Sequence, residues 1–383
     1  MKILTKKFFI KTFGCIQNTA DSERIKAFYW NKGMEEIKNW KEADVVIINT
    51  CIIRESAENR AYGFIDNINK FNKNPPALRA PSLENGGQKR GRSRHKIEII
   101  VTGCLAGLAD KDKTRKKLRQ LKKDFPTVSK FEPIEKISFD IKPLREKNDT
   151  ALIPISFGCS NFCSYCIVPF ARGPEKSRKM EKILAEIDEV IKSGFKKVML
   201  IGQNVNSYGA DFGETTLVSM GKKRFKSSFH KLLEEVAKKD LEKISFVSSN
   251  PWDFSDELIE TIAKYKNIDR LLHLPVQAGD DEVLKNMNRG YTSKEYLDLV
   301  KKIRNKVKDV RFSTDIIIGF PGEDEKAFQN TVQLCKKVGF EIAYLNKYSP
   351  RKGTVSAKIY KDDIPMSEKK RRWNILNDLI NKK

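Results

Sequence analysis

Apolar runs alternate with amphipathic segments in the first part of the chain. The runs 7–12 (KFFIKT), 44–50 (DVVIINT) and 97–103 (IEIIVTG) have the length and composition of buried strands. Helical periodicity lies around 21–30 and 54–68. Strands that alternate with helices predict a parallel sheet with helices on both faces, so we expect a doubly wound α/β domain here.

The alternation of strands and helices continues beyond about residue 150. Amphipathic helices are predicted at 181–194, which ends at Gly194, and after the capping box formed by Thr292 and Glu295. Six such β/α units predict a parallel sheet curved into a partial barrel, shorter than the eight-fold form. The six predicted strands are 152–156, 197–202, 244–248, 270–275, 311–319 and 343–349.

These patterns divide the chain into three parts. We expect a doubly wound domain at 1–148, a partial (β/α)6 barrel at 149–366 and a terminal helix at 367–383. The stretch 72–96 is rich in Pro, Gly and basic residues and has no periodicity, which is typical of a flexible insertion. A polar, basic loop is predicted at 212–229, within the barrel.

The charge of the chain indicates a kind of partner. Its 383 residues include 74 Lys and Arg but only 50 Asp and Glu, which gives a formal net charge of +24 and a pI of about 9.6. Such an excess favours a polyanionic partner, most often a nucleic acid, although solvated lysine-rich faces would give the same composition.

The N-terminus and the apolar runs bear on the compartment. The start MKILTKKFFI lacks the apolar core and cleavage site of a signal peptide, and no run approaches the ~18 residues of a membrane span. We therefore expect a cytoplasmic protein without a membrane partner, in which thiols stay reduced. The seven cysteines are then ligands, catalytic thiols or core residues rather than disulfides.

Three cysteines follow the three predicted strands of the first domain. Cys15, Cys51 and Cys104 each come just after a strand. Because ligands of such sheets bind at the carboxyl ends of the strands, these three are predicted to converge at one edge. A single cysteine there is often a buried structural residue, but three in equivalent places indicate a shared site.

Three more cysteines lie in one loop of the barrel, spaced C-x3-C-x2-C. Cys159, Cys163 and Cys166 follow the first predicted strand of the barrel, at the end where barrel active sites are built. Zinc modules use paired C-x2-C units, and no second pair follows here. Three soft thiolates suit a 4Fe–4S cluster and leave its fourth iron free for another ligand.

The remaining cysteine and the histidines have less specific interpretations. Cys335 falls on the apolar face of a predicted helix and is expected in the core. His95 lies in the basic insertion and His230 at a helix start, and three histidines make a histidine-based metal site improbable. His273, in the predicted strand 270–275, either lines the barrel or is a satisfied core histidine.

The loop 156-SFGCSNFCSYCIVPFARG-173 resembles the signature of radical S-adenosylmethionine enzymes, with Tyr165 before the last cysteine. The resemblance implies that S-adenosylmethionine chelates the open iron. One-electron reduction would then release a 5′-deoxyadenosyl radical. A cofactor of this kind is needed where an unactivated C–H bond must be broken near neutral pH.

Other motifs resemble the methylthiotransferase family over nearly the whole chain. They are 12-TFGCIQNTADSE-23, 49-NTCIIRESAENR-60, 102-TGCLAG-107, 169-PFARGPEKSR-178, 201-IGQNVNSYG-209, 273-HLPVQAGDDEVLKNMNRGY-291, 315-DIIIGFPGE-323 and 348-YSPRKGT-354. In that family the first cysteine trio holds a second 4Fe–4S cluster, so the resemblance gives this role to Cys15, Cys51 and Cys104.

Within the family, 202-GQNVNSYG-209 resembles the branch that methylthiolates carbon 2 of N6-isopentenyladenosine at position 37 of tRNA. The resemblance implies one S-adenosylmethionine as radical source, another as methyl donor, and a second cluster that supplies or carries sulfur, with both clusters facing the same adenine. Implied partners are the tRNA anticodon loop and an electron donor such as flavodoxin or ferredoxin. We expect a monomer.

Position 37 lies in a single-stranded loop, where a base can be splayed out and stacked. Arg172 and Arg178 follow the cysteine loop and are predicted RNA contacts, although ordinary salt-bridging arginines explain them equally well.

Two short stretches are predicted to touch the cofactor. Gln203 and Asn204 are expected to contact S-adenosylmethionine or the nucleoside. Gly319, Pro321 and Gly322 are expected to bring a backbone loop close to the cofactor, although a tight turn at a strand end would use the same residues.

The sequence departs from the family's pattern in two places, and rival functions stay open beside the main one. The family usually continues into a small all-β RNA-binding domain, whereas this sequence ends at Lys383, and Asn250 stands where a histidine is expected. The same chemistry on threonylcarbamoyladenosine of tRNA or on a ribosomal-protein aspartate is one alternative. A non-enzymatic iron–sulfur protein that binds RNA is another.

Overall fold

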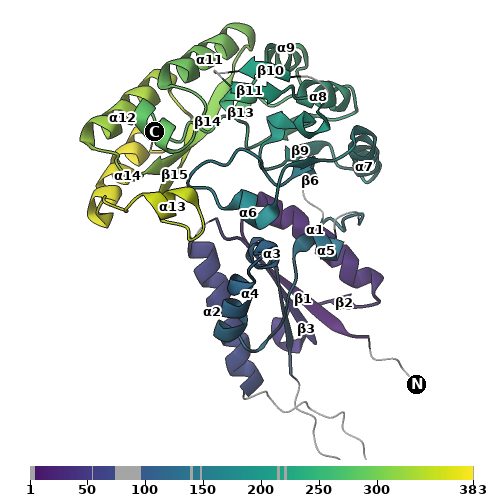
Figure 1. The fold of residues 1–383 in the computed structure, drawn as a ribbon. Helices are drawn as coiled ribbons and strands as arrows, with labels where there is room; N and C mark the ends of the chain where they lie inside the picture. Colours follow the sequence, from purple (N-terminus) through teal and green to yellow (C-terminus); the bar gives the residue numbers. More distant parts are fainter. Residues whose placement is uncertain are drawn as a thin grey trace, which may run out of the picture. The chain divides into compact units, whose positions relative to one another are not determined.

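The computed structural model describes residues 5–53, 55–73, 96–138, 141–146, 149–213, 216–219 and 222–382 (Figure 1). Most of the predicted basic insertion, from 74 to 95, lies outside these residues, as does His95. The chain folds as two compact units. The first comprises Met1–Glu146 with Phe170–Arg172, and the second comprises Lys147–Pro169 with Gly173–Lys383.

A five-stranded parallel sheet forms the centre of the first unit. Its strand order is β2-β1-β3-β4-β5, and the three strands predicted from apolar runs are the three in the middle. Every residue of β3 is buried, as its continuous apolar run requires in a sheet covered on both faces. The edge strands were not predicted because β2 is only two glutamates and β5 is half polar. The strands are β1 (Lys7–Phe13), β2 (Glu35–Glu36), β3 (Val45–Thr50), β4 (Glu98–Gly103) and β5 (Val128–Phe131).

Helices cover both faces of this sheet, as predicted for a doubly wound domain. On one face, Ile25 and Tyr29 of α1 pack with Phe8 and Ile47 of the strands. On the other, the ring of Phe64 in α2 lies 6.0 Å from that of Phe13 in β1. The helices are α1 (Ile16–Asn31), α2 (Glu55–Lys73), α3 (Cys104–Lys111), α4 (Lys116–Asp124) and α5 (Ile134–Ser138), with a 3-10 turn η1 (Trp40–Glu42).

The second unit contains all six strands predicted for the partial barrel. They form two parallel three-stranded sheets, β12-β9-β6 and β13-β14-β15. An isolated parallel bridge pairs Ile244, in the edge strand β12 of the first sheet, with Ile268, which precedes the edge strand β13 of the second. The strands are β6 (Thr150–Pro154), β9 (Lys197–Ile201), β12 (Lys243–Phe246), β13 (Leu271–His273), β14 (Arg311–Ile318) and β15 (Ile342–Lys347). A short antiparallel pair joins β7 (Ser156–Phe157) to β8 (Lys176–Ser177).

Amphipathic helices separate the strands of the second unit. The predicted capping box is present, because Thr292 and Glu295 each accept a hydrogen bond from the other's backbone at the start of α11. Cys335 of α12 is 2% exposed and belongs to the core, as expected. The α-helices are α6 (Val168–Arg172), α7 (Met180–Lys192), α8 (Phe229–Ala237), α9 (Asp256–Lys264), α10 (Asp281–Asn286), α11 (Ser293–Lys306), α12 (Glu325–Val338), α13 (Val355–Ile359) and α14 (Met366–Ile380). Short 3-10 turns are η2 (Val205–Ser207), η3 (Ala210–Phe212) and η4 (Pro251–Asp253).

One predicted loop contains regular structure. Within 212–229, strands β10 (Thr216–Ser219) and β11 (Lys222–Phe225) pair as an antiparallel hairpin. The sequence TLVS supplies β-branched residues, and a two-stranded pair needs only a short run of them, which the polar composition of the loop obscured.

The end of the chain is helical. Helix α14 packs against β15, so that Leu376 and Ile380 enter the same core as the barrel strands. No helix in the described ranges is long and apolar enough to cross a bilayer.

Candidate functional site

The first unit brings Cys15, Cys51 and Cys104 together at the carboxyl edge of its sheet. They follow β1, β3 and β4, three adjacent parallel strands. Cys51 interacts through its side chain with both of the others. This set, called here the strand-end trio, therefore lies where the sequence predicted it, although its role as a cluster ligand set stays a prediction.

Two helix N-termini and one glycine with a positive φ fix the backbone around the strand-end trio. Cys15 caps the N-terminus of α1 and Cys104 is the first residue of α3, so two of the thiols lie where helix dipoles favour negative charge. Gly103 has a φ of +83°, and a Cβ on it would meet the carbonyl oxygen of Thr50 at 2.4 Å. Only glycine fits that position without strain.

An arginine lies against the trio. Nε of Arg172 donates to Sγ of Cys104 at 3.2 Å, and Nη2 donates to Oδ2 of Asp21 at 2.8 Å. The other oxygen of Asp21 accepts from Nε2 of Gln17 at 3.1 Å. The Arg172 and Asp21 side chains are only 4% and 2% exposed.

These contacts change the interpretation of Arg172. Its guanidinium is buried and engaged inside the protein, so its placement does not support an RNA contact. Arg178 is likewise paired, with Oε2 of Glu186 at 2.6 Å and the carbonyl oxygen of Pro154 at 2.6 Å. Neither Asp21 nor Gln17 was singled out from sequence, although both lie within the motif 12–23.

The pKa values of the three thiols in the strand-end trio are shifted in different directions. The pKa of Cys15 is lowered to about 6 and that of Cys104 to about 7, in both cases chiefly by a hydrogen bond from Cys51, with a further contribution from the Arg172 charge. The pKa of Cys51 is correspondingly raised, first by its hydrogen bond to Cys104. The lowered pKa values of Cys15 and Cys104 favour the thiolate, which is the form that binds metal.

In the second unit, Cys159, Cys163 and Cys166 form the loop trio. The backbone N–H of Cys166 donates to the carbonyl of Cys163 at 2.9 Å, which closes a tight turn. Burial raises the pKa of Cys159, and the charges of Cys166 and Cys163 raise it further, so the three lie near one another. Gly158 enters the loop with a φ of +69°, where a Cβ would meet the carbonyl oxygen of Pro174 at 2.1 Å.

The segment after α10 braces this loop. Nδ2 of Asn288 donates to the carbonyl of Phe162 at 3.0 Å, and the N–H of Ser164 donates to the carbonyl of Met287 at 3.0 Å. Nη1 of Arg289 lies 3.4 Å from Sγ of Cys163. Each trio thus has one buried arginine at one of its thiols.

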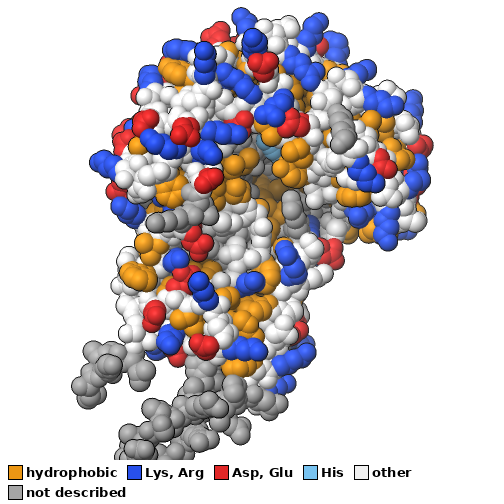
Figure 2. All heavy atoms as spheres, turned by 180° about the vertical axis from the view of Figure 1, so that it is seen from behind, with side chains coloured by type: hydrophobic (Ala, Val, Ile, Leu, Met, Phe, Trp, Pro, Cys, Tyr) orange, Lys and Arg blue, Asp and Glu red, His pale blue; other side chains and the backbone are white. Residues whose placement is uncertain are grey.

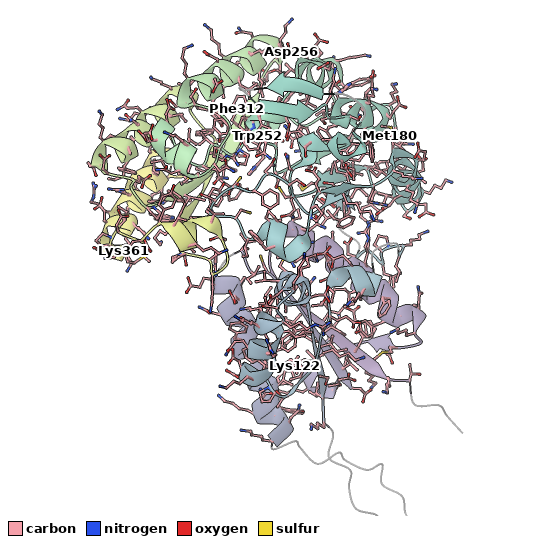
Figure 3. The ribbon with its side chains drawn as sticks, viewed as in Figure 1. Lys122, Met180, Trp252, Asp256, Phe312 and Lys361 are labelled. Carbon is pink, nitrogen blue, oxygen red and sulfur yellow. The ribbon has the colours of Figure 1, made fainter. Side chains whose placement is uncertain are left out.

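Arg289 also explains the position of Asn250. Nη2 of Arg289 donates to Oδ1 of Asn250 at 3.2 Å, and the guanidinium lies 4.6 Å from the ring of Trp252, a residue labelled in Figure 3. Asn250 thus positions the arginine that contacts Cys163. Arg289 was missed as a site residue, although it lies inside the motif 273–291.

The donor sets fit iron–sulfur cubes better than single ions. Among the described residues, no group of three or more His, Cys, Asp or Glu side chains is arranged to hold one metal ion. A 4Fe–4S cube binds each thiolate through a different iron, so its ligands surround a core instead of converging on a point. Each unit has three cysteines near one another and an arginine whose N–H donates to one of the sulfurs, and this set matches that requirement.

The predicted cofactor residues lie at two places in the second unit. Nδ2 of Asn204 donates to Oδ2 of Asp253 at 3.1 Å, while its buried Oδ1 has no partner among the described residues; Gln203 beside it is half-buried. Gly319 and Gly322 both have positive φ, which supports the predicted turn. Pro321 between them is buried. The contact of these residues with a cofactor stays a prediction.

An acidic group adjoins the loop trio. The Glu175 carboxyl accepts a hydrogen bond from Ser207, and burial raises the pKa of Glu175 to about 8, opposed by that hydrogen bond and reinforced by the charges of Asp253 and Asp211. The charge of Glu175 in turn contributes to the raised pKa of Cys159. A cation bound there would relieve this crowding.

Comparison with known families defines the class of protein. The radical SAM superfamily matches residues 153–335, and the uncharacterized protein family UPF0004 matches residues 7–124. The second unit, with its parallel strands and loop trio, is therefore that of a radical SAM protein. The predicted fold class is confirmed.

Sequence relatives define the family more closely. The tRNA-2-methylthio-N(6)-dimethylallyladenosine synthase of Thermotoga petrophila is 40% identical over 402 residues, covering 98% of this chain and 83% of that protein. A protein of the same name from Clostridium botulinum strain Okra is 39% identical over 378 residues, covering 98% and 81%. The chain belongs to the family of tRNA-2-methylthio-N(6)-dimethylallyladenosine synthases.

A solved structure shares the fold. The radical S-adenosylmethionine methyltransferase TsrM from Kitasatospora setae, with cobalamin and a 4Fe–4S cluster bound, gives a TM-score of 0.57 at 11% identity and covers 92% of this chain and 77% of that one. At this identity the likeness concerns the fold alone.

Proposed function

We propose that this protein methylthiolates carbon 2 of N6-isopentenyladenosine at position 37 of tRNA. The observation that carries the proposal is the presence of two cysteine trios, one in each unit, in a chain of this family. The strand-end trio and the loop trio each hold a 4Fe–4S cluster in this proposal. When bound, the clusters and S-adenosylmethionine supply the hydrogen-abstracting radical, the sulfur and the methyl group.

Charged side chains beside the two trios position the cysteines and the cofactor in this proposal. Arg289 donates to Cys163 and is itself held by Asn250, so it fixes the loop trio and offsets thiolate charge. Arg172 does the same for Cys104, held by Asp21. Glu175, crowded by other carboxylates, is suited to the ammonium or sulfonium group of S-adenosylmethionine.

The substrate fits the charge of the chain. A net charge of +24 suits an RNA whose phosphates must be held while one base is presented. Electrons would come from a small donor such as flavodoxin or ferredoxin, and the compartment would be the cytoplasm, where tRNA and reduced thiols coexist.

Anaerobic turnover tests the proposal. The reconstituted full chain is incubated with S-adenosylmethionine, reductant and tRNA that carries N6-isopentenyladenosine, and the nucleosides are then analysed by mass spectrometry. We expect 2-methylthio-N6-isopentenyladenosine. Product only on threonylcarbamoyladenosine tRNA or on a ribosomal protein would redirect the assignment, and no reductive cleavage of S-adenosylmethionine would end it.

A further inference from the structure

One face of the sheet β13-β14-β15 carries polar and aromatic side chains instead of core residues. Strand register pairs His273 with Ser313 and Asp315 with Tyr344. Because paired residues point to the same side and side chains alternate along a strand, these four share one face, called here the His273 face. Figure 2 shows hydrophobic side chains gathered in the upper part of the view.

The opposite face of the same sheet is occupied. Leu272, Phe312 and Ala343 belong to the main hydrophobic core, together with residues of α11, α12 and α14. Phe312, labelled in Figure 3, is 1% exposed. Helices therefore cover that side, and the His273 face is the one that remains for a ligand.

His273 has an unused nitrogen on this face. Its Nε2 lies 3.0 Å from Oδ2 of Asp315, and its side chain is only 11% exposed. Its Nδ1 is buried and has no hydrogen-bond partner among the described residues. Burial lowers the pKa of His273 to about 4, so the ring is neutral near pH 7. A neutral ring that donates Nε2–H to a carboxylate has an acceptor at Nδ1.

Aromatic and apolar surface lies beside that acceptor. The rings of Tyr344 and His273 are stacked, with centroids 5.7 Å apart and planes at 22°. Tyr344 is 48% exposed, and Ile342, two residues earlier on the same face, is 36% exposed. Exposed large apolar side chains next to a buried acceptor are typical of a site for a planar ligand with an N–H donor.

We propose that the His273 face binds the adenine base that is modified, with His273 Nδ1 accepting the N6–H and with Tyr344 and Ile342 contacting the isopentenyl group. This inference rests on the proposed function and names the substrate subsite within it. The adenine of S-adenosylmethionine also carries an N6–H donor. The exposed Ile342 favours the base that bears an apolar substituent.

Binding measurements on the reconstituted full chain, without reductant, test the proposal. Affinity is measured for tRNA with N6-isopentenyladenosine at position 37, for the same tRNA with unmodified adenosine, and for S-adenosylmethionine. His273→Leu and Ile342→Ser should each lower the preference for the isopentenylated tRNA about five- to tenfold, the size of one lost buried contact. S-adenosylmethionine affinity should stay within about twofold.

Two variants separate binding from structure. His273→Gln can keep a donor to Asp315 and an acceptor, so it should restore part of the preference that His273→Leu loses. Met366→Ser removes another exposed apolar side chain, 51% exposed at the start of α14, and should leave the preference unchanged. Iron content and the melting temperature show whether each variant is folded and loaded.

The outcomes are distinct. If the wild-type protein makes the methylthio product while His273→Leu and Ile342→Ser keep the full preference, this inference is overturned and the proposed function stands. A fall in S-adenosylmethionine affinity alone would assign the face to the cofactor's adenine and overturn the substrate assignment. A wild-type protein that neither cleaves S-adenosylmethionine nor modifies tRNA would overturn both.

Discussion

The Nε atom of Arg172 lies 3.2 Å from Sγ of Cys104, while the same guanidinium forms a buried ion pair with Asp21. A positive and a negative group are thus fixed beside one thiol. The reduction potential of an iron–sulfur cluster depends on hydrogen bonds to sulfur, on nearby charge and on solvent access. The two residues should therefore change that potential in opposite directions.

We predict that Arg172→Met lowers the midpoint potential of the cluster bound by the strand-end trio and that Asp21→Asn raises it. Removing the cation disfavours the more negative reduced cluster, and removing the anion favours it. The measurement is a redox titration monitored by electron paramagnetic resonance. In the protein used, Cys159, Cys163 and Cys166 are replaced by alanine so that only the cluster of the strand-end trio remains. Arg172→Lys keeps the charge and should shift the potential less.

Arg178→Met is the matched control, because that arginine pairs with Glu186 in the other unit. Shifts of the same sign in Arg172→Met and Asp21→Asn, at equal iron content, would indicate a general loss of packing and contradict the electrostatic role.

The two trios should fail in different ways. Cys15→Ala should leave cleavage of S-adenosylmethionine and abolish the methylthio product, whereas Cys163→Ala should abolish both. Each should lower iron from roughly eight to roughly four per chain if each trio holds one four-iron cluster. Cys335→Ala, a change in the core, should keep both clusters. Methylthio product from Cys15→Ala at the wild-type rate would refute the role of the strand-end trio.

The sequence allowed much of this site to be predicted because its chemistry is local. The loop trio is a contiguous spacing, and the strand-end trio follows from three apolar runs that each end at a cysteine. The contacts of Arg172 and Arg289 could not be predicted from the sequence. Their partners Asp21 and Asn250 are distant in sequence, and an arginine beside a motif looks the same whether it faces RNA or a thiol.

The unpredicted elements of the fold have a similar explanation. The edge strand β2 is two glutamates, and its pairing with β1 depends on a neighbour that is already in place. The hairpin β10–β11 lies in a stretch whose polar composition predicted a loop. Periodicity finds elements that bury a face, and these elements bury little.

Binding of tRNA should weaken steeply with salt. The chain has a net charge of +24. Each phosphate of the RNA loop that its basic side chains neutralise releases counterions from the RNA. The logarithm of the association constant should then fall linearly with the logarithm of salt concentration, by about 0.7 per phosphate contact. Fluorescence anisotropy at several potassium chloride concentrations gives the slope, and a flat response would mean that charge does not hold the RNA.

Glu175 should make stability depend on pH. Its pKa in the folded protein is about 8 against 4.5 for an ordinary glutamate, because the carboxyl is buried next to other acids. Between these values the folded protein holds a proton that the unfolded chain has lost, so the free energy of unfolding falls as pH rises. The stability that this group contributes is complete below about pH 4.5 and is lost as pH rises through about 8.

Glu175→Gln removes this titration. Relative to the wild type, the variant should gain stability from pH 5 to pH 9, on the order of 2 kcal/mol after allowance for solvent screening. Thermal unfolding of both proteins across this range measures the gap. Glu181→Gln, at an exposed position in α7, serves as the control for replacing a glutamate carboxylate by an amide. A constant difference for Glu175→Gln would mean that its carboxyl is ionised throughout, already paired with a cation or with water.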